Sequence, residues 1–143
     1  MLKNIDLLLN ADLLYALQSM GHGDKLALVD ANFPAKSKCK HTLVTMNGID
    51  CTAMLKSILQ HLPLYDFSAT PIEIMAADNS TQPTDAALDF IKTIKKSDEN
   101  RHQYSLIERF NFYNTVNSCQ LVISTNDLRP YACILLQKGI ISD

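Results

Sequence analysis

The chain has 143 residues, of which 47% are hydrophobic and 20% are charged, and its formal net charge at pH 7 is -2. This length is enough for one hydrophobic core and too short for two, so we expect residues 1–143 to form a single domain. There is no excess of basic residues to neutralise phosphates, which argues against nucleic acid or an anionic membrane as a partner.

Charged residues interrupt the N-terminal segment. Asp6 and Asp12 flank the apolar run Leu7–Leu9, so the segment lacks the long uncharged region of a signal peptide, and no part of the chain approaches a membrane-spanning length. The four cysteines are scattered and show no C-x-x-C spacing, which is typical of free thiols in a reducing compartment. We therefore expect a cytoplasmic protein.

In chain order, the first half of the sequence predicts a helix, two strands and a second helix. Asn10 can cap a helix that runs to about Met20, and Gly21 is a natural stop for it. The next helix covers about 51–62, after a capping Asp50. Between these helices lie short apolar runs bounded by turn residues, which we predict to be strands over residues 25–29 and 42–46.

The second half continues the alternation. A strand over 72–76 precedes a polar, turn-rich segment and a helix over about 84–95. Ser105 and Glu108 match a capping box, which predicts a helix from Ser105 to about Asn117. Two final strands are predicted, over residues 121–124 and 131–136. Strands that alternate with helices of this length predict an α/β domain with helices packed on a mixed β-sheet.

His22 lies between two glycines, directly after the first predicted helix. Imidazole can both give and take a proton near neutral pH, and flanking glycines let a ligand approach the backbone closely. This pattern predicts an acid/base role for His22; the alternative is an exposed loop residue beside a helix cap. Asp24 is expected to bind nearby backbone amides instead of a ligand.

Two other charged side chains are candidates for ligand binding. Asp30 ends the strand predicted over 25–29, where open α/β sheets usually bind ligands, although a carboxylate there can also serve a turn. We expect Asp30 and His22 to lie on adjacent loops. Arg109 follows the apolar pair Leu106–Ile107 and precedes Phe110, and it could hold a carboxylate, a phosphate or vicinal hydroxyls, or form a salt bridge. Tyr131 is a candidate hydrogen-bond donor.

Other residues, and the absence of several motifs, limit the types of reaction that the chain could catalyse. The near-helical spacing of Phe110, Phe112 and Tyr113 favours the core over a sugar platform. The remaining histidines are expected at the surface, at positions 41, 61 and 102. The sequence has no paired histidine metal motif, no glycine-rich phosphate loop and no G-x-S-x-G elbow. Metal-free proton transfer is then the simplest enzymatic interpretation.

Five segments in the same order along nearly the whole chain resemble the L-fucose mutarotase/D-ribose pyranase family. They are residues 20–24 (MGHGD), 30–35 (DANFPA), 75–77 (MAA), 108–113 (ERFNFY) and 131–139 (YACILLQKG). Within the family, GHGD followed by DANFPA resembles the fucose branch. The resemblance implies a sugar mutarotase without a cofactor, which interconverts the α and β anomers of L-fucose.

The same resemblance implies roles for individual residues. His22 matches the catalytic acid/base. The positions that match sugar contacts are Asp30, Arg109, Tyr131, Ala132 and Cys133. Cys133 departs from the family pattern, because many members have an amide side chain there. The family also implies a ring-shaped homo-decamer with sites near subunit boundaries. The alternatives are a D-ribose pyranase, a mutarotase for another monosaccharide, and a sugar-binding protein without turnover.

Overall fold

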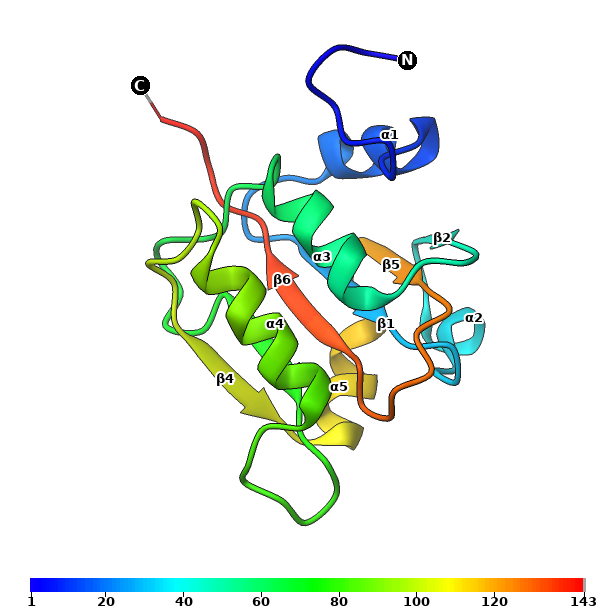
Figure 1. Ribbon diagram of the computed structural model, residues 1–143, viewed down its shortest axis with the longest axis vertical. Coiled ribbons are helices and arrows are strands. Elements are labelled where there is room, and N and C mark those ends of the chain that lie inside the picture. The colour runs from blue at the N-terminus through cyan, green and yellow to red at the C-terminus, as the bar shows by residue number, and fades with distance from the viewer. Residues whose placement is uncertain (143) are drawn as a thin grey trace.

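The computed structural model describes residues 1–142 and is built around one six-stranded sheet (Figure 1). Its strands are β1 (Lys25–Val29), β2 (Thr42–Thr45), β3 (Ile72–Met75), β4 (Tyr104–Ile107), β5 (Leu121–Ser124) and β6 (Ile134–Gln137). They lie in the order β2-β5-β1-β6-β3-β4. β6 runs antiparallel to β1 and β3, while the other pairings are parallel. The predicted class, helices packed on a mixed sheet, is confirmed.

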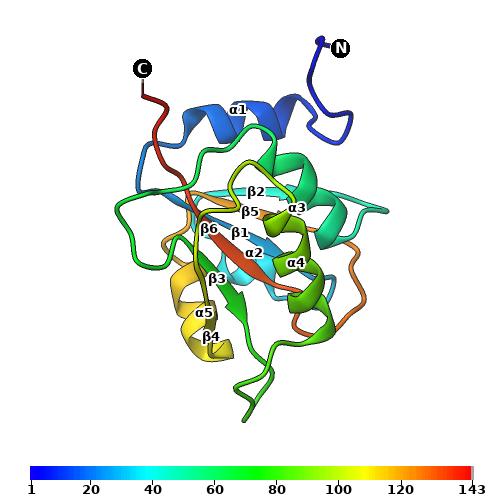
Figure 2. The same ribbon diagram turned by 60° about the vertical axis from the view of Figure 1, so that its left-hand side comes forward.

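Helices cover both faces of the sheet (Figures 1 and 2). They are α1 (Ala11–Ser19), α2 (Ala35–Lys38), α3 (Cys51–Leu59), α4 (Asp85–Lys95) and α5 (Arg109–Val116). Residues of α1, α3 and α4 pack on one face, and those of α2 and α5 pack on the other. Side chains alternate along β1, so Leu26 and Leu28 face the first group while Ala27 and Val29 face the second.

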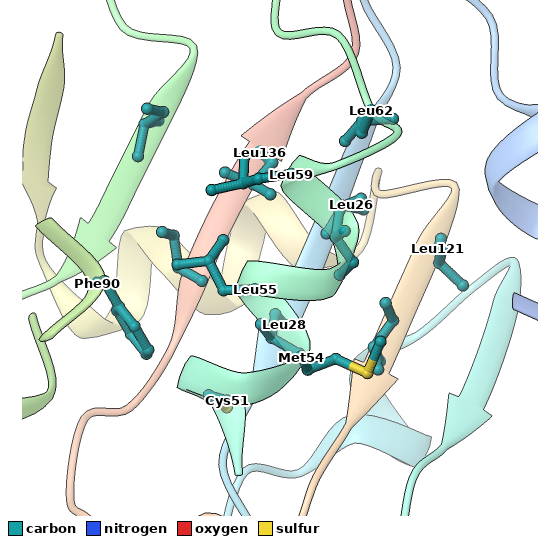
Figure 3. Packing of buried hydrophobic residues seen from close by; sticks show 14 of the residues in the cluster. Leu26, Leu28, Cys51, Met54, Leu55, Leu59, Leu62, Phe90, Leu121 and Leu136 are labelled. Atoms are coloured by element: carbon teal, nitrogen blue, oxygen red, sulfur yellow. The ribbon is translucent and has the colours of Figure 1, made fainter. Parts of the chain in front are cut away.

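The larger core lies between α3, α4 and the sheet (Figure 3). Met54 and Leu55 of α3 are fully buried above the sheet, and Phe90 of α4 is fully buried beside them. Asp50 caps α3 as predicted, since its carboxylate accepts the Ala53 backbone N–H at 2.8 Å. The buried apolar face and the polar cap at the helix start therefore both stabilise α3.

The segment around Ser105 differs from the prediction. A helix does not begin there; residues 104–107 form β4, and α5 begins four residues later at Arg109. Glu108 is the cap, because its carboxylate accepts the N–H groups of Phe110 and Asn111, the second and third residues of α5, at 2.9 and 3.0 Å. Pairing with β3 satisfies this backbone and packs Leu106 against the core. These tertiary contacts outweigh the local capping-box signal.

Three further departures concern segments beside the sheet. Helix α2, which follows Pro34, was not among the predicted elements. β6 begins at Ile134 instead of residue 131, because Tyr131 has a φ of 60°, in the left-handed region that strands do not use. His102 was expected at the surface, but its side chain is only 6% exposed and Nε2 lies 3.0 Å from Glu99 Oε2.

The strand directions give the sheet two distinct edges. We call the edge where β1 to β5 end the carboxyl edge; its loops are residues 30–34, 76–84 and 125–133, together with the start of α5. The opposite, amino edge carries the segments that precede these strands and the residues that follow β6, among them 21–24, 64–71 and 138–139. No helix within residues 1–142 combines the length and apolar character needed to cross a membrane.

Candidate active site

A pocket of about 240 Å³ opens at the carboxyl edge, and we call it the Asp30 pocket. Its lining residues are Asp30, Asn32, Phe33, Met75, Arg109, Tyr113, Pro130, Tyr131 and Cys133. Four of the six predicted site residues therefore meet in one place. Larger cavities lie between α3 and α4 and beside α1, but none of the predicted residues lines them. Among residues 1–142, no group of three or more His, Cys, Asp and Glu side chains is placed to hold a metal ion.

Asp30 serves both the turn and the pocket. Its Oδ1 accepts the Asn32 N–H at 2.9 Å, and its Oδ2 lies 3.3 Å from the Cys133 thiol, which donates to it. Burial raises the pKa of Cys133 well above its ordinary value, and the nearby negative charge of Asp30 raises it further. The thiol therefore stays protonated and fixes one oxygen of the carboxylate.

Arg109 reaches the Asp30 pocket from the first residue of α5. Its Nε lies 3.1 Å from Asp78 Oδ1 and its Nη2 lies 3.0 Å from Asp78 Oδ2, so the salt-bridge alternative also holds. The guanidinium lies 4.6 Å from the centre of the Phe110 ring. A guanidinium has five N–H donors, and Asp78 engages two of its nitrogens, so donors remain for a ligand. Phe112 is in the core as predicted, whereas Phe110 is 58% exposed.

Tyr131 lines the Asp30 pocket with a backbone conformation that is rare outside glycine. Its φ of 60° is sustained by a turn in which its carbonyl accepts the Cys133 N–H at 2.8 Å. Such conformations concentrate at functional sites. Ala132 does not line the pocket; its side chain is fully buried and its carbonyl accepts the Cys51 thiol at 3.1 Å.

Behind the Asp30 pocket lies an ion pair that sequence analysis did not single out. Asp127 is 3% exposed, and its two oxygens accept Nε and Nη2 of Arg129 at 3.0 and 2.7 Å. Its Oδ2 also accepts the Cys51 backbone N–H at 3.0 Å. Burial raises the pKa of Asp127, but the hydrogen bonds from Arg129 and Cys51 and the positive charge of Arg129 lower it below its ordinary value. The pair therefore stays ionised.

The ion pair joins the loops on both sides of the Asp30 pocket to the helices behind it. The Asp127 carbonyl accepts the Ala31 N–H at 2.9 Å. The Arg129 guanidinium also donates to Asp89 of α4 at 2.6 Å and to Thr52 of α3 at 2.8 Å. The sequence signal for this arrangement is the D-x-R pattern of residues 127–129, which begins three residues after the end of an apolar strand, because the other partners of the pair are distant in the chain.

His22 lies at the amino edge, on an exposed turn. Gly23, with a φ of 85°, supplies a conformation that few other residues adopt readily. Its N–H donates to the Lys138 carbonyl at 2.7 Å and its carbonyl accepts from Gln137 Nε2 at 3.0 Å. Asp24 closes the turn by accepting the Gly21 N–H at 2.8 Å, as expected for a local contact. The end of β6 therefore fixes the His22 turn.

The structure separates His22 from the Asp30 pocket. His22 precedes β1 and Asp30 follows it, and this strand of five residues spans about 16 Å. The expectation that these two residues lie on adjacent loops is therefore wrong, since β1 places their loops at opposite edges of the sheet. Within one copy, the candidate acid/base group does not reach the candidate binding residues.

The carboxyl edge carries a small pocket lined by a carboxylate, a guanidinium and a tyrosine. Such a group of donors and acceptors on an α/β sheet defines a domain that binds a small, polar, polyhydroxylated ligand. The chain belongs to the RbsD / FucU transport protein family, whose sequence model matches residues 3–141.

Individual relatives agree with this assignment. The chain is 34% identical to a fucose mutarotase from Danio rerio over 98% of its own length and 94% of that protein. It is 32% identical to an L-fucose mutarotase from Histophilus somni (strain 2336), over 98% of this chain and 97% of the relative. The crystal structure of the fucose mutarotase from Streptococcus pneumoniae in complex with L-fucose superposes with a TM-score of 0.88 at 28% identity, covering 99% of this chain and 100% of that one.

Proposed function

We propose that the chain is one mutarotase domain that interconverts the α and β anomers of L-fucose. The observation that carries the proposal is the grouping of Asp30, Arg109 and Tyr131 around a pocket of about 240 Å³, which suits one monosaccharide. The L-fucose complex of the Streptococcus pneumoniae relative supports this sugar as the substrate.

The reaction requires two proton transfers. A base removes the proton of the anomeric hydroxyl while an acid protonates the ring oxygen, so that the bond from C1 to the ring oxygen breaks and the open aldehyde forms. Rotation about C1–C2 and reclosure give the other anomer. His22 exchanges the proton, while Asp30, Arg109 and Tyr131 hold hydroxyls and polarise the ring oxygen. Positioned acid/base groups typically accelerate a reaction by about 10²- to 10⁴-fold, which is sufficient for a conversion that already occurs in water.

In this mechanism the site combines two copies of the chain. His22 of one copy is fixed at the amino edge, and the binding residues lie at the carboxyl edge, so the His22 turn of a neighbouring copy meets the Asp30 pocket of the first. Each copy contributes to two sites in this arrangement. We propose a homo-oligomer on this ground, and a ring-shaped decamer on the resemblance to the family.

Saturation-difference proton NMR on L-fucose tests the activity, by irradiation of one anomeric signal and observation of the other. We expect transfer with the wild type and a rate at least about 100-fold lower with His22→Ala, the loss typical of a general acid/base. His41→Ala is the matched control, because His41 is exposed, lies on a different turn directly before β2, two strands away from β1, and does not line the Asp30 pocket. Equal rates for wild type and His22→Ala would refute the catalytic assignment.

The two-copy site is tested by mixing two inactive variants, His22→Ala and Asp30→Asn, and refolding them together. A pocket from the first variant and a His22 turn from the second form an intact site, and random assembly produces such sites at about one quarter of positions. We expect recovery of about that fraction of the exchange rate. Recovery of none of it would place all catalytic residues in one copy.

The same NMR measurement separates the alternatives. Exchange with D-ribose but not L-fucose would identify a pyranase, and a panel of monosaccharides would identify another sugar. Binding of a sugar without faster exchange would identify a binding protein without turnover.

The cytoplasm is the compartment we propose. All four cysteines are free and three of them are buried, which suits a reducing environment. Detection of the protein with cytoplasmic markers after cell fractionation would support this placement, and detection in a secreted fraction would contradict it.

A further inference from the structure

A small aromatic cluster, formed by Tyr65 and Phe67, lies beside His22 at the amino edge. The His22 ring lies 6.1 Å from the Tyr65 ring, and the Tyr65 ring lies 5.8 Å from the Phe67 ring. Phe67 is 77% exposed. Grouped exposed apolar side chains mark contact surfaces, whereas scattered ones need no explanation. In a single copy this cluster faces solvent, and it cannot contact a sugar in the Asp30 pocket, because that pocket lies at the opposite edge of the sheet.

The backbone at Tyr65 is held as firmly as the His22 turn. Its N–H donates to the Gln137 carbonyl at 3.0 Å, and Leu64 forms a β-bridge with Lys138. Gly139 passes so close to this segment that a Cβ atom there would overlap the Leu64 carbonyl. The absence of a side chain at Gly139 thus permits the contact.

The end of β6 therefore binds two segments at once. Gln137 and Lys138 hold the His22 turn on one side and the backbone around Tyr65 on the other. Any approach that brings His22 to the pocket of a neighbouring copy must bring the Tyr65 ring with it.

We propose that Tyr65 of one copy positions the sugar in the Asp30 pocket of its neighbour. This inference rests on the proposed function and adds a substrate-contacting residue to the surface that supplies His22. L-Fucose has a methyl group at C5 and an apolar ring face, and aromatic rings pack well against such surfaces. The Asp30 pocket offers polar groups beside the apolar side chains of Phe33, Met75 and Pro130, and the incoming Tyr65 ring covers the part of the sugar that faces its open mouth.

The rim of the Asp30 pocket has a matching apolar surface. Phe110 is 58% exposed, and its ring lies 6.1 Å from that of Tyr113, which lines the pocket. Phe67 of the neighbouring copy packs against this rim. The contact excludes water from the reacting sugar and strengthens the hydrogen bonds made there.

Mixed assemblies test which copy supplies Tyr65. In the first mixture, His22→Ala/Tyr65→Ala is combined with Asp30→Asn, so each intact site has a native Tyr65 beside its His22. In the second, His22→Ala is combined with Asp30→Asn/Tyr65→Ala, so each intact site lacks the ring. Both mixtures contain the same three substitutions. The parent mixture, without a change at Tyr65, is the reference.

We expect the first mixture to match the reference and the second to show a KM for L-fucose about tenfold higher, a loss typical of one well-packed aromatic contact. Equal KM values in the two mixtures would overturn the proposal. Impairment of the first mixture would also overturn it, because Tyr65 would then act within its own copy or in folding. No recovery in the parent mixture would instead refute the two-copy site itself.

The choice of sugar tests the apolar contact. D-Arabinopyranose has the same arrangement of ring hydroxyls as L-fucopyranose but lacks the methyl group. We expect Tyr65→Ala to raise the KM for L-fucose more than that for D-arabinose, and Tyr65→Phe to behave as the wild type. Tyr15→Ala, at an exposed tyrosine on α1, is the matched surface control. An equal rise for both sugars would refute contact with the methyl group.

Discussion

The contact between Cys133 and Asp30 sets the geometry of one carboxylate in the pocket. The thiol is 1% exposed and stays protonated, so it acts as a weak donor to Oδ2 while the Asn32 N–H binds Oδ1. An amide at position 133, as in many family members, would offer a stronger donor. The carboxylate is thereby oriented by its own chain before any sugar binds.

We predict that Cys133→Ala lowers kcat/KM for L-fucose about threefold to tenfold, the effect of one lost hydrogen bond to a substrate-binding group. The matched control is Cys119→Ala, which removes an equally buried thiol in the α5 layer, away from the pocket lining. Both variants lose a sulfur atom and leave a similar void. Equal kcat/KM values, measured by the NMR exchange assay, would show that the thiol does not orient Asp30.

At the scale of elements, the Asp127–Arg129 pair holds the β5–β6 loop in place. We predict that Arg129→Met destabilises the protein by about 3 kcal/mol at pH 7, because it leaves a buried carboxylate without its cation. The displaced loop should also raise the KM for L-fucose, since it carries Tyr131. Arg101→Met is the control, because Arg101 pairs with Asp66 at the surface, where such pairs contribute little.

The pH dependence of that effect has a definite sign. The pKa of Asp127 is lowered in the folded protein, so the pair stabilises it above the pKa of an unfolded aspartate, near 3.9, and this contribution is lost as the pH falls below that value. Urea unfolding should show a large difference between wild type and Arg129→Met at pH 7 and a smaller one at pH 3. An equal difference at both pH values would assign the loss to packing alone.

Comparison of the predicted with the observed elements shows which helices and strands local sequence signals determine. Short apolar runs and caps such as Asn10 and Asp50 predicted the helices and strands that depend on local signals. Ser105 was misassigned because its capping box is local, whereas the pairing of β4 with β3 is not. Asp30, Arg109 and Tyr131 meet because strands that run parallel end at one edge. The outside partners of the Asp127–Arg129 pair could not be predicted, because they come from α3, α4 and the loop after β1.

At the scale of the whole molecule, β1 separates the proposed binding residues from His22. A sequence pattern gives the spacing of residues along a chain but not the copy of the chain in which they act. Two-fold pairing or ring closure completes every pocket, while an open row of copies leaves one pocket without its His22 turn. In a closed assembly, every proposed pocket therefore has a His22 turn from a neighbouring copy.

Activity should consequently depend on assembly. We predict that the exchange rate per chain falls on dilution in step with the oligomeric fraction measured by mass photometry. The far-UV circular dichroism should stay constant, because the six-stranded sheet and its covering helices come from one chain. Phe67→Asp should shift both curves to higher protein concentration, since it places a charge in the proposed contact, while Tyr15→Asp, equally exposed at 77%, should not. A constant rate per chain in samples that contain only monomers would show that one copy holds a complete site.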